Sequence, residues 1–344
     1  MGRSRATGAA GPPGLAMVSW IRFHARSRDL AEALGAQAVF MPWAWPGRSL
    51  PSTLLGWLRS GLRTRRVVRS LPTGSVVVAM APPVFCPLVA LAAAPGRGVR
   101  LVIDLHSGAL NDARWRWTFG IMRWAIRRAE AVIVTNPDLL EGQDTGATPV
   151  LVIHDPFWVR GRPEAGPNPL PGRPYALFPA SGGADEPIEA LAEAAALLTG
   201  QVEVVVTGDR PPGDDGPAMR RTGFLPRAEF QRLMAGAAVV LALTTREATM
   251  QRAAYEGLQL GRPLVCSDTG VLRRVFADAA VFVDNTGPAI AAGISEAIAG
   301  AGQLQAAGAA VQATMRAESQ RGLDAVRALS RAATSHPAGF PRGA

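Results

Sequence analysis

Short runs of apolar, mostly β-branched residues recur along the chain and alternate with longer segments whose apolar residues follow a helical period. The apolar runs cover residues 75–80, 100–105, 131–135, 150–153, 175–180, 202–207, 239–243, 263–267 and 280–283. Because these runs do not alternate between apolar and polar residues, they predict strands buried on both faces, as in parallel sheets. Segments 186–198 and 227–237 have the period and composition of the helices that cover such sheets. The pattern predicts an α/β fold.

A stretch rich in proline and glycine divides the apolar runs into two groups. Eight Pro or Gly residues lie between His154 and Pro174, a composition that sustains neither a helix nor a central strand. We therefore expect two doubly wound domains, each with its ligand crevice at the carboxyl ends of its strands. The expected boundaries are a disordered start at 1–16, a first domain at 17–155, a linker at 156–174, a second domain at 175–302, terminal helices at 303–332 and a disordered tail at 333–344.

The segment 76–94 is the one candidate for a membrane span, because its 19 residues carry no charge. It contains Pro82, Pro83 and Pro87, which interrupt a continuous helix. A strand, a Pro-Pro turn and a short helix explain the prolines better, and we expect that arrangement.

The segment 53–71 combines leucines, arginines and Trp57 in one helical pattern. The expected apolar stripe consists of Leu54, Leu55, Leu58, Leu62 and Val67 or Val68, and the charge comes from Arg59, Arg63, Arg65, Arg66 and Arg69. Such a helix is typical of one that lies on anionic lipid. An ordinary surface helix of the first domain has the same pattern, so both interpretations stay open.

Composition and charge add a second contrast between the two halves. The 344 residues are 48% hydrophobic and 18% charged, which excludes disorder for most of the chain. All 36 basic residues are Arg, and residues 1–150 carry a net charge of +10 whereas residues 151–344 carry −1. All eight Trp lie in residues 20–158. Arg and Trp together are typical of a surface that binds a membrane or a nucleic acid. The alternative is a solvated basic face with the Trp residues in the core.

The cysteines and the first residues indicate a compartment. Cys86 and Cys266 lie 180 positions apart, which is neither a metal-binding spacing nor a disulfide framework and favours a reducing compartment. The start carries Arg3 and Arg5 but no apolar segment before Met17, so we expect no secretory signal.

A loop after the seventh apolar run carries the residue types that bind phosphate. Thr245, Arg246 and Thr249 stand between a predicted strand and the N-terminus of a predicted helix, where backbone N–H groups, hydroxyls and a guanidinium can bind a diphosphate. We expect Glu256, on that helix, to accept hydrogen bonds from ribose hydroxyls and Glu247, in the loop, to contact a sugar. The alternatives are a helix-surface carboxylate at Glu256 and stabilisation of the first helical turn at Glu247.

The same segment resembles the GT-B glycosyltransferases, especially the sugar-nucleotide-dependent family 4, whose second domain carries a Glu-x7-Glu motif before a Gly-x-Pro strand entry. Residues 255–265 read Tyr-Glu-Gly-Leu-Gln-Leu-Gly-Arg-Pro-Leu-Val, like the second half of that motif, and residues 267–270 read Ser-Asp-Thr-Gly, like the turn after it. The resemblance covers residues 18–298 and implies a GT-B fold, with two Rossmann-like domains facing across a cleft. Here eight residues rather than seven separate Glu247 from Glu256, so the retaining stereochemistry usual for the motif is not carried over.

A weaker likeness links the chain to the mannosyltransferases that extend chitobiosyl-diphosphodolichol. It rests on Pro82-Pro83, on Val-Ile-Asp-Leu-His at 102–106 and on Phe-Pro-Ala-Ser at 178–181 before Asp185-Glu186. Those relatives are inverting, GDP-mannose-dependent and membrane-associated, so the stereochemistry stays open.

His106 is the candidate for proton transfer. It follows a predicted strand, where an imidazole can hydrogen-bond a sugar hydroxyl or assist proton transfer, and the resemblance implies that it approaches the donor sugar. The alternative is a structural His that forms its hydrogen bonds with the next loop. Asp104, on the same face of the strand, orients His106 or caps the strand.

The loop 19–28, between a first short strand and a helix at 29–34, is expected to bind the acceptor. In the family this loop is often rich in glycine, but here it carries His24 and Arg26, which suit an anionic acceptor such as a lipid diphosphate. A solvated basic loop is the alternative.

The turn Ser181-Gly182-Gly183 suits backbone contact with the donor phosphates, with Asp185 as the expected N-cap of the helix that follows. Many relatives place an Arg and a Lys near this turn, where this chain has Asp185 and Glu186. We therefore expect Arg246 or an Arg of the first domain to supply the positive charge.

These patterns lead to one function and two alternatives. We expect a hexosyltransferase-type glycosyltransferase that moves a sugar from a nucleoside-diphosphate sugar to a lipid-linked or polysaccharide acceptor of the cell envelope, with no cofactor and no metal. We expect it in the cytoplasm, with an anionic membrane as a candidate partner at the inner face of the plasma membrane. The alternatives are a degenerate GT-B scaffold and, less favoured because no nucleic-acid motif is evident, a basic nucleic-acid-binding protein.

Overall fold

The computed structural model describes residues 14–42, 49–155, 170, 172–208, 213–214 and 219–331. The chain divides into two compact units: unit 1 comprises Met1–Val159 and Glu318–Ala344, and unit 2 comprises Arg160–Ala317. Most of the expected disordered start and linker, and the whole expected tail at 333–344, lie outside the described residues. In place of the terminal helices expected at 303–332, the structure has a single helix, α11 (Ala301–Arg331). It begins in unit 2 and ends in unit 1.

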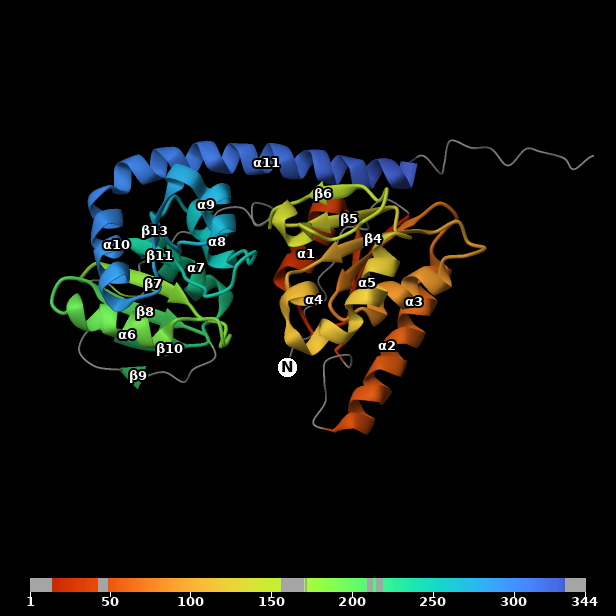
Figure 1. Cartoon of the computed structure of the whole chain (residues 1–344), viewed down its shortest axis with the longest axis horizontal. Helices are drawn as coiled ribbons and strands as arrows, with labels where there is room; N and C mark the ends of the chain where they lie inside the picture. Colours follow the sequence, from red (N-terminus) through yellow and green to blue (C-terminus); the bar gives the residue numbers. More distant parts are fainter. Residues whose placement is uncertain are drawn as a thin grey trace, which may run out of the picture. The chain divides into compact units, whose positions relative to one another are not determined.

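Unit 1 is a six-stranded parallel sheet with helices between the strands (Figure 1). Its strands are β1 (Leu15–Ser19), β2 (Gln37–Phe40), β3 (Val76–Ala81), β4 (Arg100–Leu105), β5 (Ala131–Val134) and β6 (Val150–Val152), in the order β2-β1-β3-β4-β5-β6. Its helices are α1 (Ala25–Leu34), α2 (Leu50–Ser70), α3 (Phe85–Ala93), α4 (Gly108–Asn111) and α5 (Phe119–Ile126), with 3-10 turns at Ala113–Thr118 and Pro137–Leu140. The strand order reverses between β1 and β3, which is where ligands of such sheets bind.

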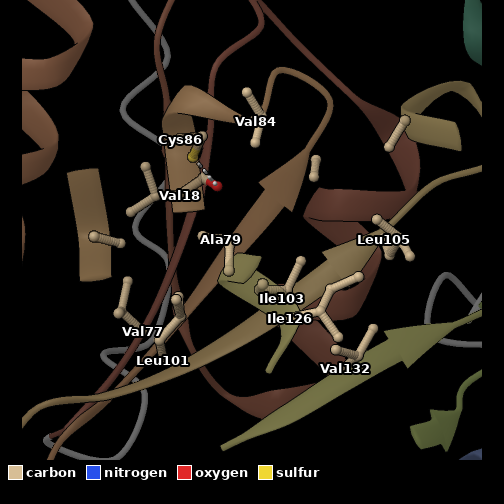
Figure 2. Close-up of a cluster of buried hydrophobic side chains, with 14 of the residues drawn as sticks. Val18, Val77, Ala79, Val84, Cys86, Leu101, Ile103, Leu105, Ile126 and Val132 are labelled. Carbon is tan, nitrogen blue, oxygen red and sulfur yellow. Dashed lines mark hydrogen bonds between the residues drawn. The ribbon is translucent and has the colours of Figure 1, made fainter. Parts of the chain in front are cut away.

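The core of unit 1 lies on both faces of the sheet. Figure 2 shows one face, where Val77, Ala79 and Ile103 of the central strands meet Val84, directly before α3, and Cys86, in its first turn. The Cys86 thiol donates a hydrogen bond to the Val18 carbonyl oxygen at 3.6 Å, and burial raises the pKa of this thiol well above its ordinary value. Because both faces are covered, the strands lack polar alternation, as the sequence predicted.

The uncharged segment 76–94 forms the expected strand, turn and helix. β3 ends at Ala81, and α3 begins at Phe85 after the two prolines. Among the described residues, no helix is both long enough and apolar enough to cross a bilayer.

Unit 2 has a second sheet of the same kind, with one antiparallel strand added at its edge. Its strands are β7 (Tyr175–Pro179), β8 (Glu203–Thr207), β9 (Gly213–Asp214), β10 (Met219–Gly223), β11 (Val239–Ala242), β12 (Leu264–Ser267) and β13 (Ala280–Val283), in the order β13-β12-β11-β7-β8-β10-β9. Its other elements are α6 (Ile188–Leu197), α7 (Arg227–Gly236), α8 (Arg252–Gln259), α9 (Gly270–Phe276), α10 (Gly287–Ala299) and a 3-10 turn at Ala277–Ala279. Only β9 runs antiparallel, and the strand order reverses between β7 and β11.

Both units therefore confirm the expected α/β class with doubly wound parallel sheets. Three short strands were not expected: β2, β9 and β10. β10 pairs with β8, but Arg220, Arg221 and Thr222 give it no apolar pattern. A strand near the edge of a sheet can carry these polar residues, because its side chains are partly exposed.

Gly208, directly after β8, lies against the loop after β7. Its φ is +119°, and a Cβ at this position would lie 1.9 Å from the Ala180 carbonyl oxygen. Only glycine fits a backbone approach this close.

We predict that Gly208→Ala lowers the free energy of unfolding by at least about 3 kcal/mol, because it combines a backbone clash with an unfavourable φ. The matched control is Gly200→Ala, which also has a positive φ, +82°, but would meet no atom within 4 Å. That control is expected to lose about 1 kcal/mol. Urea unfolding of both variants tests the difference, and equal losses would contradict the close approach.

Candidate functional site

Each unit places polar side chains at the carboxyl edge of its sheet, and the two sites are described separately. The site in unit 1 centres on Asp104, near the end of β4. Arg26 Nη2 donates to Asp104 Oδ1 at 3.1 Å, and His106 Nε2 lies 2.9 Å from Asp104 Oδ2. Asp104 is fully buried and Arg26 is 5% exposed, so the ion pair is shielded from water.

Asp104 is ionised in this site. Burial by itself would raise the pKa of its carboxyl, but the charges of Arg26 and His106 and hydrogen bonds from both outweigh burial and hold the pKa well below its usual range. As a carboxylate it accepts from both neighbours. His106 Nε2 therefore donates to Asp104, and Nδ1 forms no hydrogen bond with any described residue. In the neutral form of the ring, the lone pair is at Nδ1.

His106 combines this orientation with access to solvent, since its side chain is 19% exposed. A neutral imidazole oriented by a carboxylate can accept a proton at its other nitrogen, as a general base does. The arrangement agrees with the expectation that Asp104 orients His106.

His24 and Arg26, the expected acceptor-binding residues, both contact this site. The His24 ring lies edge-on to the His106 ring, with 4.8 Å between centroids. Its Nδ1 accepts from the Ser27 backbone N–H at 3.3 Å and so caps α1. Arg26 donates to the Ile153 carbonyl oxygen at 3.0 Å, and its buried Nη1 has no hydrogen-bond partner among the described residues.

His154, two residues after the end of β6, was not singled out as a site residue by the sequence. Its Nε2 lies 2.9 Å from Glu318 Oε2, and its backbone N–H donates to Ser319 Oγ at 3.1 Å. Burial lowers the pKa of His154 below its ordinary value, although Glu318 opposes the shift. Both partners lie on α11, more than 160 residues away, so no local pattern pointed to this contact.

The site in unit 2 lies where the strand order reverses, between the loops that follow β7 and β11. Asp185 joins these loops: Thr244 Oγ1 donates to Asp185 Oδ2 at 2.7 Å, and Arg246 Nη1 lies 3.4 Å from Asp185 Oδ1. The Thr245 backbone N–H donates to the Asp185 carbonyl oxygen at 2.8 Å. The expected N-cap role of Asp185 is wrong, because α6 begins after Pro187 without a side-chain cap.

Ser267, at the end of β12, and Asn285, after β13, support the loop after β11. The Thr244 backbone N–H donates to Ser267 Oγ at 2.9 Å, and Asn285 Nδ2 donates to the Thr244 carbonyl oxygen at 3.0 Å. Ser267 also donates to Asn285 Oδ1 at 2.7 Å. Thr244 is thus fixed at its backbone and its side chain, which positions Thr245 and Arg246 after it.

The turn Ser181-Gly182-Gly183, expected to bind the donor phosphates, binds the carboxylate of Glu186 in this structure. Glu186 Oε1 accepts from the Ser181 backbone N–H at 2.5 Å and from Ser181 Oγ at 2.7 Å, and Oε2 accepts from the Gly182 N–H at 3.1 Å. Gly183 continues the turn, where a Cβ would lie 2.8 Å from Asp185 Oδ1. The backbone N–H groups of this turn therefore form an anion-binding nest.

Glu247 and Glu256 lie in different elements. The sequence indicated that they could approach one another only if Glu247 lay in the loop, and it does. Glu247 lies in the loop, where its Oε2 accepts from the Gly270 N–H at 3.2 Å and its carbonyl oxygen accepts from Thr249 Oγ1 at 3.2 Å. Glu256 lies on α8, and Arg252 Nε donates to it at 2.9 Å. Arg246 is 46% exposed.

Metal binding was not expected from the sequence. Within the described ranges, no three His, Cys, Asp or Glu side chains are grouped closely enough to hold an ion.

We predict that Asp104→Asn lowers the free energy of unfolding by about 3–5 kcal/mol, because it leaves the Arg26 charge buried without its partner. The double variant Arg26→Met/Asp104→Asn removes both charges and is expected to be more stable than Asp104→Asn alone. Urea unfolding at pH 7 measures both. If the double variant is no more stable than the single one, the buried charge is not the cause.

A second prediction concerns pH. Because burial lowers the pKa of folded His154 below its unfolded value of about 6.5, the unfolded state binds more protons in that window. Stability is therefore expected to fall as the pH drops from 7 to 5, and to fall less in His154→Gln. Asp104 does not contribute there, because its pKa lies far below this window. Unfolding curves at several pH values provide the measurement, and equal slopes would exclude His154 as the source.

The comparisons with known proteins rest on structure. No family model matches the chain, and no curated protein matches its sequence. HepE of Anabaena, solved in complex with UDP and glucose, is 14% identical at a TM-score of 0.66, over 94% of this chain and 100% of that one. Sucrose-phosphate synthase from Thermosynechococcus elongatus is 15% identical at a TM-score of 0.68, over 92% of this chain and 100% of that one. A UDP-N-acetylglucosamine 2-epimerase is 11% identical at a TM-score of 0.63, over 96% of this chain and 100% of that one. The chain has the GT-B fold, with two Rossmann-like domains, as the resemblance implied.

Proposed function

We propose that this protein is a glycosyltransferase that moves a hexose from a nucleoside-diphosphate sugar to an acceptor hydroxyl. Solved proteins that share its fold over nearly the whole chain include HepE bound to UDP-glucose and a sucrose-phosphate synthase. The fold by itself does not decide the reaction, because an epimerase shares it. The assignment therefore rests on the chemistry of the two sites.

The observation that supports the proposal most is the anion-binding nest of unit 2. The Ser181 and Gly182 N–H groups hold the Glu186 carboxylate at the edge where a doubly wound sheet binds its ligand. A diphosphate oxygen offers the same charge and the same acceptor geometry as that carboxylate. In the proposed complex, the diphosphate takes the place of Glu186.

The other residues of unit 2 complete the proposed donor site. Arg246 exchanges its contact with Asp185 for the diphosphate and stabilises the charge of the leaving group. Thr245 and Thr249 contribute hydroxyls, Glu256 accepts from the ribose, and Glu247 contacts the transferred sugar. No cofactor or metal ion is part of this proposal.

In unit 1, the proposed role of His106 is that of a general base. The acceptor hydroxyl oxygen bonds to the anomeric carbon, the bond from that carbon to the diphosphate oxygen breaks, and the hydroxyl proton passes to His106 Nδ1. The nucleoside diphosphate leaves with the electron pair. His24 and Arg26 contact the acceptor in this proposal, and Arg26 Nη1 is a buried donor that an acceptor oxygen can satisfy.

The proposed acceptor is lipid-linked or part of a cell-envelope polysaccharide. We propose a cytoplasmic protein that binds peripherally to the inner face of the plasma membrane. The excess positive charge in residues 1–150 supports an anionic surface as partner.

A second candidate is a degenerate scaffold that keeps the fold without the activity. It is favoured by the occupants of the donor site, because Glu186 fills the nest and Asp185 pairs with Arg246. The two candidates differ in nucleotide binding.

We predict that a nucleoside diphosphate or its sugar raises the melting temperature in a thermal-shift panel of UDP, GDP, ADP and their hexose conjugates. Glu256→Gln is expected to weaken the affinity for the active nucleotide roughly tenfold or more, because it removes a charged hydrogen-bond acceptor. The control is Glu296→Gln, an exposed carboxylate on α10. Absence of any shift would favour the scaffold, and recovery of an epimerised nucleotide sugar with no transfer to water or acceptor would overturn glycosyl transfer.

A further inference from the structure

Helix α2 packs against unit 1 through its small residues and exposes its leucines. The buried positions are Thr53, Gly56, Ser60, Thr64 and Val68. The exposed ones include Leu50 at 72%, Leu54 at 52%, Leu58 at 60% and Leu62 at 49%. This reverses the usual arrangement, in which a surface helix buries its large apolar side chains. The exposed leucines lie on adjacent positions over roughly a third of the helix circumference.

The polar contacts under α2 fix the helix in this orientation. Trp20 Nε1 donates to Thr64 Oγ1 at 2.8 Å, and Thr64 and Ser60 donate to backbone carbonyl oxygens one turn earlier. The bond from Trp20 forms only with this face inward, and the bonds within the helix satisfy the two hydroxyls that the packing removes from water. In Figure 1 the first turns of α2 extend past the other elements of unit 1.

An apolar groove of about 320 Å³ lies where α2 meets α3. Its lining is Trp20, Trp57, Leu58, Gly61, Leu62, Arg65, Phe85 and Val89. Arg65 is the only charged residue among them, so the groove suits a hydrocarbon rather than a polar ligand. Its volume is ample for several methylene groups, because an apolar cavity of roughly 150 Å³ holds benzene.

Aromatic side chains continue from the groove onto the neighbouring surface. The Phe85 ring lies 4.6 Å from the Trp57 ring and 6.0 Å from the Trp117 ring between centroids. Trp117 is 63% exposed and Trp124, on α5, is 46% exposed. Exposed tryptophans beside an apolar surface are typical of a membrane interface.

The charge around the groove identifies the occupant. Residues 33–103 contain eight Arg and no acidic residue. Five of these Arg are exposed on α2: Arg59, Arg63, Arg65, Arg66 and Arg69. Arg59, Arg65 and Arg66 form no ion pair within the described part of the chain. An exposed apolar stripe bordered by unopposed Arg complements an anionic amphiphile, and it disfavours a second copy of this strongly basic surface.

We propose that α2 lies on an anionic membrane and that the groove between α2 and α3 binds one hydrocarbon chain of an anionic lipid from it. The lipid phosphate then contacts Arg65 at the groove, and the exposed leucines enter the acyl region. This site does not depend on the proposed glycosyl transfer, because none of its residues belongs to the donor or acceptor sites described above.

Gly61 makes the test possible without disturbing the packing of α2. A Cβ at this position would lie 3.6 Å from Val89 Cγ2 and 3.8 Å from a Trp20 ring carbon, which is ordinary contact. Gly61→Ala is therefore expected to fit, and Gly61→Leu to fill the groove. Both changes raise helix propensity. The control is Gly302→Leu on α11, where a Cβ meets no atom within 4 Å.

The probe is dodecyl phosphate below its micellar concentration, titrated by calorimetry into the full-length protein. We expect saturable binding to the wild type and to Gly302→Leu, at most a few-fold weaker binding to Gly61→Ala, and at least a tenfold loss in Gly61→Leu. Equal affinity of Gly61→Leu and wild type would overturn the groove as the site, as would equal binding of dodecyl trimethylammonium. Inorganic phosphate that displaces the probe at equal concentration would show that the head group alone is recognised and would also overturn it.

Vesicle sedimentation tests the membrane surface independently. The wild type is expected to sediment with phosphatidylglycerol vesicles and not with phosphatidylcholine vesicles, and Arg59→Glu/Arg63→Glu/Arg66→Glu to remain in the supernatant. Sedimentation of the triple variant with anionic vesicles would refute the surface. A wild-type dimer in analytical ultracentrifugation that Gly61→Leu converts to a monomer would assign the groove to a second copy instead and overturn the proposal.

Discussion

The buried ion pair between Arg26 and Asp104 determines the arrangement of polar groups in unit 1. A carboxylate without contact to water requires a cation and further donors, and it has them in Arg26 and His106. Because Arg26 follows β1 and also donates to the Ile153 carbonyl after β6, one guanidinium links three parts of the carboxyl edge. The tautomer of His106, and therefore its capacity to accept a proton, follows from this pair.

The network of unit 2 is only partly buried, because Thr244 is buried and Asp185 is 13% exposed but Arg246 reaches solvent. Asp185 joins the loops after β7 and β11 through Thr244 and Arg246, and Arg246 stays half exposed. A contact of this kind is weak enough to exchange for a ligand, whereas the buried pair of unit 1 is not. The proposed division of labour follows: unit 1 presents a fixed base, and unit 2 presents cations and N–H groups that can change partners.

The sequence was sufficient to predict the central strands, because β3, β4, β11 and β12 carry apolar residues at most positions of both faces. It was insufficient where contacts between distant or polar residues determine the structure. The strand β10 is polar, and the partners of His154 lie on α11, far along the chain. Glu186 hydrogen-bonds to Ser181, which no sequence pattern indicated. The leucine stripe of α2 was recognised, but amphipathic period alone does not say which side is buried. Of the two valines offered for that stripe, Val67 and Val68, the second is fully buried, because the face of small residues allows the close approach to unit 1.

The two thiols have a practical consequence for work in solution. Cys86 and Cys266 are both free and buried, and burial raises the pKa of Cys266 to about 12 and that of Cys86 further. Maleimides react with thiolates that water can reach, so neither native sulfur competes for such a dye. A cysteine introduced on an exposed helix position would accept a fluorophore selectively in the otherwise unaltered chain, which permits single-molecule spectroscopy without a cysteine-free background.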